Sequence, residues 1–184
     1  MTGGPDSGKA TPASRAGPPS ARAGWQALAG TLAWSAIMAA SALAWIMRSG
    51  WHLDDRAGEI MLIFAIGGAV AFVPAVLIAK RLSRGRRDTG FASAFLVLAV
   101  ATLGLTALLY GLQYREYYAA WHGPVGSKLW LNQFVFTTLS GVYQFLVLGL
   151  RMFLPLGLPA LIVASVVLAR SARSAGVTRA PDMR

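Results

Sequence analysis

The chain contains no cysteine in 184 residues, and only seven Asp and Glu stand against 17 Lys and Arg. The lack of cysteine excludes disulfides, thiolate metal ligands and thiol nucleophiles, and it leaves the redox compartment undetermined. Charged residues of both signs make up only 13% of the chain, which is about half of their share in soluble domains. A chain with so few charges does not have the surface of an ordinary soluble domain.

The chain is instead rich in apolar residues, which make up 55% of it and give a mean hydropathy of +0.53. They gather in stretches long enough to cross the hydrocarbon core of a bilayer, which is about 30 Å thick. The pattern predicts spans at residues 25–47, 60–79 and 90–114, followed by a longer apolar stretch at 129–169. We therefore expect an all-α, polytopic transmembrane helical bundle.

Two tails flank the expected bundle. Residues 1–24 are dominated by Gly, Ala, Ser and Pro and predict a disordered tail; residues 25–169 form the bundle, and residues 170–184 a basic tail. The tripeptide 42–44 has the form of a signal-peptidase site. The apolar stretch around it is longer than the apolar core of a typical signal peptide, so we favour an uncleaved first span.

The stretch at 129–169 carries a single charge, Arg151. As one helix its 41 residues would extend about 60 Å, twice the thickness of the hydrocarbon core, so it must break. Its first part is rich in polar residues, which suits an interfacial or re-entrant helix on the outer side. We expect the fourth span from about residue 145 to 169, bent by Pro155 and Pro159. A five-span alternative remains open, because residues 129–150 alone are long enough to cross.

The distribution of Lys and Arg predicts the orientation. The N-terminal tail, the loop at 80–87 and the C-terminal tail hold three, five and four of them, twelve in all, whereas the opposite loops hold four. The positive-inside rule then places both termini in the cytoplasm and requires an even number of crossings. The alanine- and arginine-rich composition favours a bacterial inner membrane. The basic clusters adjoin the spans, so we expect them to contact anionic lipids and not nucleic acid.

The outer loops contain imidazole and carboxylate side chains that are candidate metal ligands: His52, Asp54, Asp55, Glu59, Glu116 and His122. Their spacing matches no metal signature, and they would come from two separate loops. The simpler alternative is that Asp54 and Asp55 cap the second helix. Both histidines are expected beyond the helix ends, which also disfavours axial haem ligation. We predict no cofactor.

Arg151 is the residue with the strongest individual signal. A charge buried within a span costs about 3 kcal/mol on insertion scales and usually marks function. If the crossing starts near residue 145, Arg151 lies about 9 Å inside, close enough to reach the headgroups. The functional alternative pairs it with Glu116, Glu59 or a lipid phosphate.

No nucleophile elbow or phosphate-binding loop is present, and we favour a non-enzymatic role. The leading hypothesis is an accessory or assembly subunit that binds a membrane-protein partner or a second copy. A small-residue ridge at Ala36, Ala40 and Ala44 is one candidate contact. The alternatives are a membrane metal- or haem-binding protein and a small oligomeric transporter or channel. The candidate pathway residues of the latter are Arg151, Gln144, Gln133 and Asn132.

Overall fold

The computed structural model describes residues 19–51, 53, 55–83 and 89–177, and its regular elements there are all helical. The first three helices are α1 (Pro19–Arg48), α2 (Asp55–Ser83) and α3 (Thr89–Tyr117). Each contains a predicted span and extends beyond it at both ends. Helix α1 begins at Pro19, inside the segment expected to be a tail, and proline suits a first helical position because that N–H has no helical partner. Residues 1–18, for which the sequence predicts disorder, lie outside the described residues.

The second half of the chain is broken into shorter elements, as the length of the apolar stretch requires. A 3₁₀ turn precedes α4, a π-helical turn joins α4 to α5, and a short turn separates α5 from α6. Their bounds are η1 (Ala119–Trp121), α4 (Lys128–Gln144), η2 (Phe145–Gly149), α5 (Leu150–Phe153) and α6 (Gly157–Val177).

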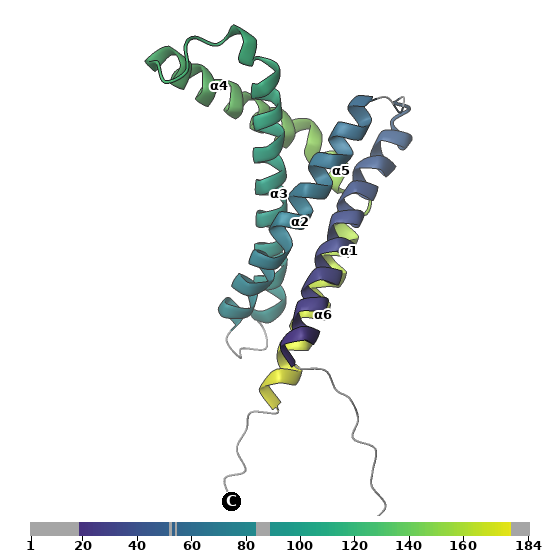
Figure 1. The fold of residues 1–184 in the computed structure, drawn as a ribbon. Helices are drawn as coiled ribbons and strands as arrows, with labels where there is room; N and C mark the ends of the chain where they lie inside the picture. The colour runs from purple at the N-terminus through teal and green to yellow at the C-terminus, as the bar shows by residue number, and fades with distance from the viewer. Residues whose placement is uncertain (1–18, 52, 54, 84–88, 178–184) are drawn as a thin grey trace, which may run out of the picture.

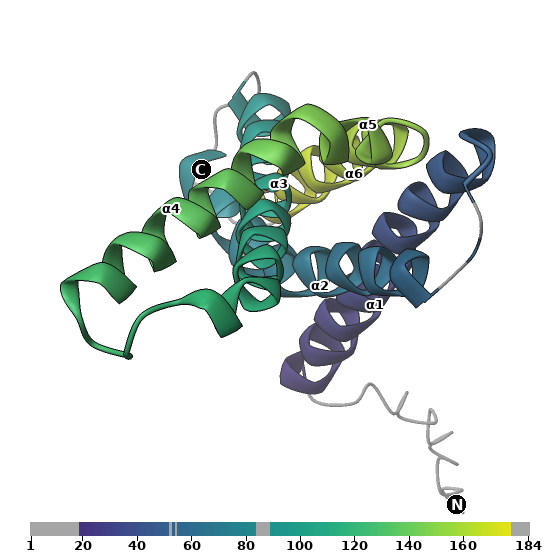
Figure 2. The same ribbon diagram turned by 90° about the horizontal axis from the view of Figure 1, so that it is seen from above.

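Helices α1, α2, α3 and α6 run roughly along one direction, whereas α4 runs across one end of them (Figure 1). We call the end at which α1 begins and α6 ends the tail end, and the end at which α4 lies the hairpin end. Seen from above, α4 extends sideways from the group of four (Figure 2). The predicted fold class, a helical bundle with an extra helix before the last span, is confirmed.

Four helical segments are long and apolar enough to cross a membrane: Arg22–Arg48, Arg56–Ser83, Thr89–Tyr117 and Lys128–Phe153. The apolar part of α6, Gly157–Ser171, is shorter. Although the fourth segment qualifies by length, its α4 portion lies across the direction of α1–α3 (Figures 1 and 2). The protein is therefore a multi-pass membrane protein. The start of α1 and the end of α6 lie at the same end of the bundle (Figure 1).

The interior of the bundle is built around one face of α1. Trp34, Met38 and Ala42 recur at four-residue spacing and are buried. The Trp34 indole N–H donates a hydrogen bond to the Thr102 hydroxyl of α3 at 3.1 Å, which satisfies a polar group in an apolar interior. Of the predicted small-residue ridge, Ala36 is exposed and Ala40 and Ala44 are half-buried. The ridge therefore lies outside this interior face and stays a candidate contact for a partner. The close approach between α1 and α2 is made instead at Gly68, where a Cβ would lie 2.8 Å from the Met38 side chain.

The break between α5 and α6 is bridged by a serine from α1. The Ser41 hydroxyl, 0% exposed, accepts hydrogen bonds from the amides of Leu156 (3.1 Å) and Gly157 (3.0 Å). It also lies within donating distance of the carbonyl oxygens of Met152 (2.8 Å) and Phe153 (3.1 Å). The first amides of a helix lack partners within it, so Ser41 serves as the N-cap of α6 from another helix.

Two further features shape the route from α4 to α6. The π-helical turn places Phe145 inside the bundle, with its ring 5.9 Å from Phe64 and 6.1 Å from Tyr110. Gly149 makes room for that ring, because a Cβ there would lie 2.5 Å from it. Pro155, which cannot donate a hydrogen bond, lies in the turn itself, and Pro159 lies in the first turn of α6. The proline pair thus produces a break rather than a bend.

Replacing Ser41 with alanine should destabilise the bundle, because two buried amides at the start of α6 lose their acceptor. We expect a loss of about 1–3 kcal/mol and a lower unfolding temperature in detergent or nanodiscs. Ser165→Ala is the matched control, since Ser165 is equally buried but bonds only to the carbonyl of Leu161 in its own helix. Equal unfolding temperatures for the two variants would contradict the capping role.

Candidate functional site

The hairpin formed by α3, η1 and α4 is the part of the chain that extends away from the bundle, and it holds half of the sequence-predicted polar candidates. Its two helices cross at a pair of glycines. A Cβ on Gly141 would lie 2.7 Å from the Cα of Gly111, and a Cβ on Gly111 would lie 2.7 Å from the Thr138 carbonyl oxygen. This backbone contact fixes the position of α4, and only glycine permits it at either site.

Arg115 joins α3 to α4 beyond that crossing. Its guanidinium carbon lies 5.0 Å from the ring centre of Phe134 and 5.9 Å from that of Trp130. One terminal nitrogen also pairs with Glu116 at 2.9 Å. The planar guanidinium can stack on aromatic faces in a way that an ammonium cannot. Arg115 therefore stabilises the hairpin and is not a free cation at its surface.

Hydrogen bonds from α4 order the connection between the two helices. The Ser127 hydroxyl caps α4 by accepting from the Trp130 amide at 3.0 Å. Gln133, a predicted pathway residue, accepts from the Gly123 amide at 2.8 Å. His122 is half-buried, and within the described part of the chain neither ring nitrogen has a hydrogen-bond partner or solvent access. Gln133 thus has a structural partner in the loop.

Aromatic side chains cluster between the end of α3 and the end of η1. Rings of neighbouring residues lie 5.0–6.2 Å apart, and the set consists of Tyr114, Tyr117, Tyr118 and Trp121. A hydrogen bond with Tyr114 and the charge repulsion between the two phenolates raise the pKa of Tyr118. Trp121 and nearby Val125 are 68% and 84% exposed. The cluster presents a large, uncharged surface at the hairpin end.

The other predicted pathway residues do not converge. Gln144 is half-buried at the end of α4, whereas Asn132 is exposed near its beginning. Arg151 is exposed on α5, and within the described residues it takes part in no ion pair. Its exposure leaves the guanidinium able to extend toward the headgroups.

The proposed metal ligands are likewise dispersed where the structure describes them. Glu59 accepts a hydrogen bond from Gln113 at 2.9 Å, and Glu116 pairs with Arg115. His52 and Asp54 lie outside the described residues, and so does the side chain of Asp55. Among described residues no group of three or more His, Asp or Glu is close enough to hold a metal ion.

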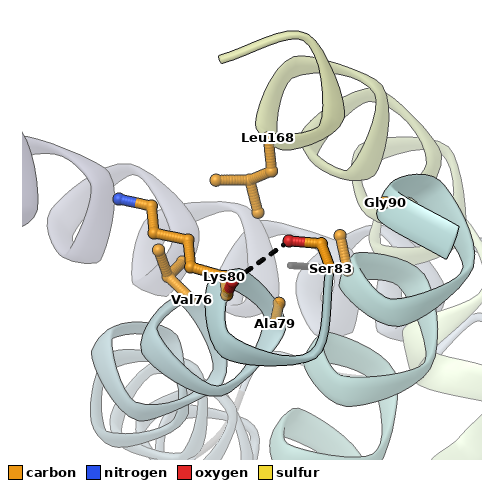
Figure 3. Close-up of a pocket in the computed structure, with 7 residues that line it drawn as sticks. Val76, Ala79, Lys80, Ser83, Gly90 and Leu168 are labelled. Carbon is orange, nitrogen blue, oxygen red and sulfur yellow. Dashed lines mark hydrogen bonds between the residues drawn. The ribbon is translucent and has the colours of Figure 1, made fainter. Parts of the chain in front are cut away.

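A small cavity lies at the opposite, tail end, between the end of α2, the start of α3 and α6 (Figure 3). It is lined by Lys80 and Ser83 together with the apolar side chain of Leu168, and its volume is about 10 Å³. Ser83 donates to the Lys80 carbonyl oxygen at 3.2 Å. Such a volume accommodates about one water molecule and no organic ligand.

Comparison of the chain with protein-family models, with curated proteins and with solved structures found no match.

Gly141→Ala should separate α3 from α4, because the new methyl group would meet the Gly111 backbone, which cannot move aside. Overpacking of this kind costs about 1–3 kcal/mol, and we expect less folded protein and faster proteolysis of the hairpin. Gly104→Ala is the control, since a Cβ there meets nothing within 4 Å. Equal proteolysis of both variants would show that the glycine crossing does not hold α4.

Arg115→Met should loosen the hairpin by removing the stacked cation, and Arg115→Lys should do so by less. We expect a loss of about 1 kcal/mol for the methionine variant, seen as faster hydrogen exchange in residues 119–144. Arg56→Met removes an exposed cation at the same end of the bundle and serves as the control. If the Arg115 and Arg56 variants exchange alike, stacking on Phe134 and Trp130 contributes nothing.

Proposed function

We propose that the protein is a non-enzymatic accessory or assembly subunit of a complex in a bacterial inner membrane. The observation that carries this proposal is the hairpin, which extends beyond the bundle (Figure 1). It exposes large apolar and aromatic side chains there. Trp and Tyr are enriched at the centres of protein–protein contacts. The partner is a membrane protein that covers the aromatic cluster around Trp121.

The orientation that we propose places the tail end in the cytoplasm and the hairpin end on the outer side. The support is the excess of Lys and Arg in the segments that meet at the tail end, to which Lys80 and Arg81 of α2 belong. The same cations are positioned to contact anionic headgroups. Arg151 then extends toward outer headgroups from α5.

A hairpin lying along the outer surface suits this role for a physical reason. Two of the contacts that fix it, the glycine crossing and the Arg115 stack, lie on the side of α4 that faces α3. The aromatic rings at its tip pack against one another. A preorganised surface loses little conformational entropy when it binds, which favours recognition.

The test is co-purification in mild detergent with an affinity tag on the C-terminal tail. We expect a stoichiometric membrane-protein partner with the native chain and its loss with Trp121→Ala. Trp25→Ala is the matched control, because Trp25 is 71% exposed at the tail end and should retain the partner. Consistent isolation without any partner protein would overturn the proposal, and so would solute flux through the purified protein in liposomes.

A further inference from the structure

One face of α4 points away from α3, and its apolar and aromatic side chains are more than half exposed in the described chain. Its residues recur at alternating spacings of three and four: Leu129, Asn132, Phe136, Leu139 and Tyr143. We call this set the lateral face. Its four apolar or aromatic members are 58%, 69%, 56% and 68% exposed in chain order. The 3-4 spacing is that of a coiled-coil seam, in which the apolar residues of one helix pack against another helix.

The two flanks of α4 determine where the lateral face points. One flank carries Gln133, Thr137 and Ser140, and the Gln133 bond to Gly123 turns it toward the loop at the hairpin end. The opposite flank carries Leu131 and Val135, both exposed. An amphipathic helix at a membrane surface directs its polar flank to water and its apolar flank to the acyl chains. The lateral face then points sideways, parallel to the membrane plane and away from the bundle.

We infer that the lateral face binds the lateral face of a second copy of this chain. This inference rests on the proposed outer position of α4, and it assigns this surface to self-association while the aromatic cluster remains for the partner protein. Two copies in one membrane are related by a two-fold axis along the membrane normal. That rotation reverses the direction of any helix lying in the membrane plane, so the two α4 helices pair antiparallel.

Antiparallel pairing makes the seam self-complementary. When Phe136 packs against Leu139 of the second copy, the same register brings Asn132 beside Tyr143 of the second copy, and the pairs repeat by symmetry. The carboxamide of Asn132 and the phenol of Tyr143 each offer a donor and an acceptor. The two polar groups of the face thus satisfy each other.

Lipid is a less favourable neighbour for this face, because it leaves the polar group of Asn132 without a hydrogen-bond partner. Acyl chains match the leucines and the phenylalanine, but they offer no hydrogen bond to the Asn132 amide, which lies among these side chains. In coiled coils a single Asn among apolar seam residues fixes the register between paired helices, and Asn132 is the one carboxamide of the lateral face. The lateral face thus has the 3-4 spacing of apolar residues and the Asn of such a seam. The apolar flank, Leu131 and Val135, contains no polar residue.

The cysteine-free chain permits a direct test by disulfide formation in liposomes that contain only the purified protein. Two differently tagged variants, Asn132→Cys and Tyr143→Cys, are reconstituted together and oxidised with copper phenanthroline. We expect a disulfide between the two tagged chains and little between chains of the same variant. In the antiparallel register, two copies of position 132 lie about 16 Å apart along the helices, beyond the ~7 Å limit for a disulfide.

Three outcomes would overturn the inference. Disulfides within one variant and none in the mixture would indicate parallel pairing. No disulfide in any sample would mean that the face is covered by lipid. Equal disulfide formation with a mixture of Leu131→Cys and Val135→Cys chains, on the apolar flank, would indicate random collision.

A second measurement quantifies the contact without new cysteines. Phe136→Ala combined with Leu139→Ala should raise the dimer dissociation constant by at least about tenfold, measured by single-molecule photobleaching in liposomes. The control combines Leu131→Ala with Val135→Ala, which removes similar exposed apolar groups from the same helix. Equal effects would refute the lateral face as the contact. Since these liposomes contain no partner protein, the result is independent of the co-purification that tests the proposed function.

Discussion

A single hydroxyl group determines how the second half of this chain can exist in a membrane. The apolar stretch after residue 128 crosses the end of the bundle and then turns to run along it, and the turn exposes backbone amides that lipid cannot satisfy. Ser41 accepts from two of them and lies within reach of two carbonyl oxygens on the other side of the break. Because the serine comes from α1, the same contact that permits the turn also positions α6 beside the first helix. The placement of α4 follows, since it must connect the end of α3 to this fixed break.

The glycine crossing supplies the second constraint on α4. Gly111 and Gly141 bring the backbones of α3 and α4 into contact, and Arg115 stacks on α4 rings farther along the hairpin. The orientation of α4 about its own axis is thereby set, with Gly141 toward α3. Every other property of α4 follows from this orientation: the polar flank faces the loop, the apolar flank faces away from it, and the lateral face is directed outward from the molecule.

Composition and residue spacing were enough to predict the number and position of the apolar helices. A span is recognised from the hydropathy of about twenty consecutive residues, which does not depend on how the helices pack. The sequence indicated the helices, the need for a break in the last apolar stretch and a polar-rich helix before it. The particular contacts depended on which faces meet, which no local pattern specifies. Ser41 was one of many small residues in α1, and the ridge at Ala36 had equal sequence support although that residue is exposed. The 3-4 spacing of the lateral face, by contrast, was already visible in the sequence.

The bond from Ser41 to the start of α6 joins residues 115 and 116 positions apart. During synthesis the chain is made from its N-terminus, so α1 enters the bilayer long before its hydrogen-bond partners exist. Its serine must remain unsatisfied, or borrow a carbonyl of its own helix, until the last helix is inserted. Completion of the fold is therefore tied to completion of the chain. A truncated product lacks the cap contact, and it presents to the cell's quality control a polar group that the finished protein hides.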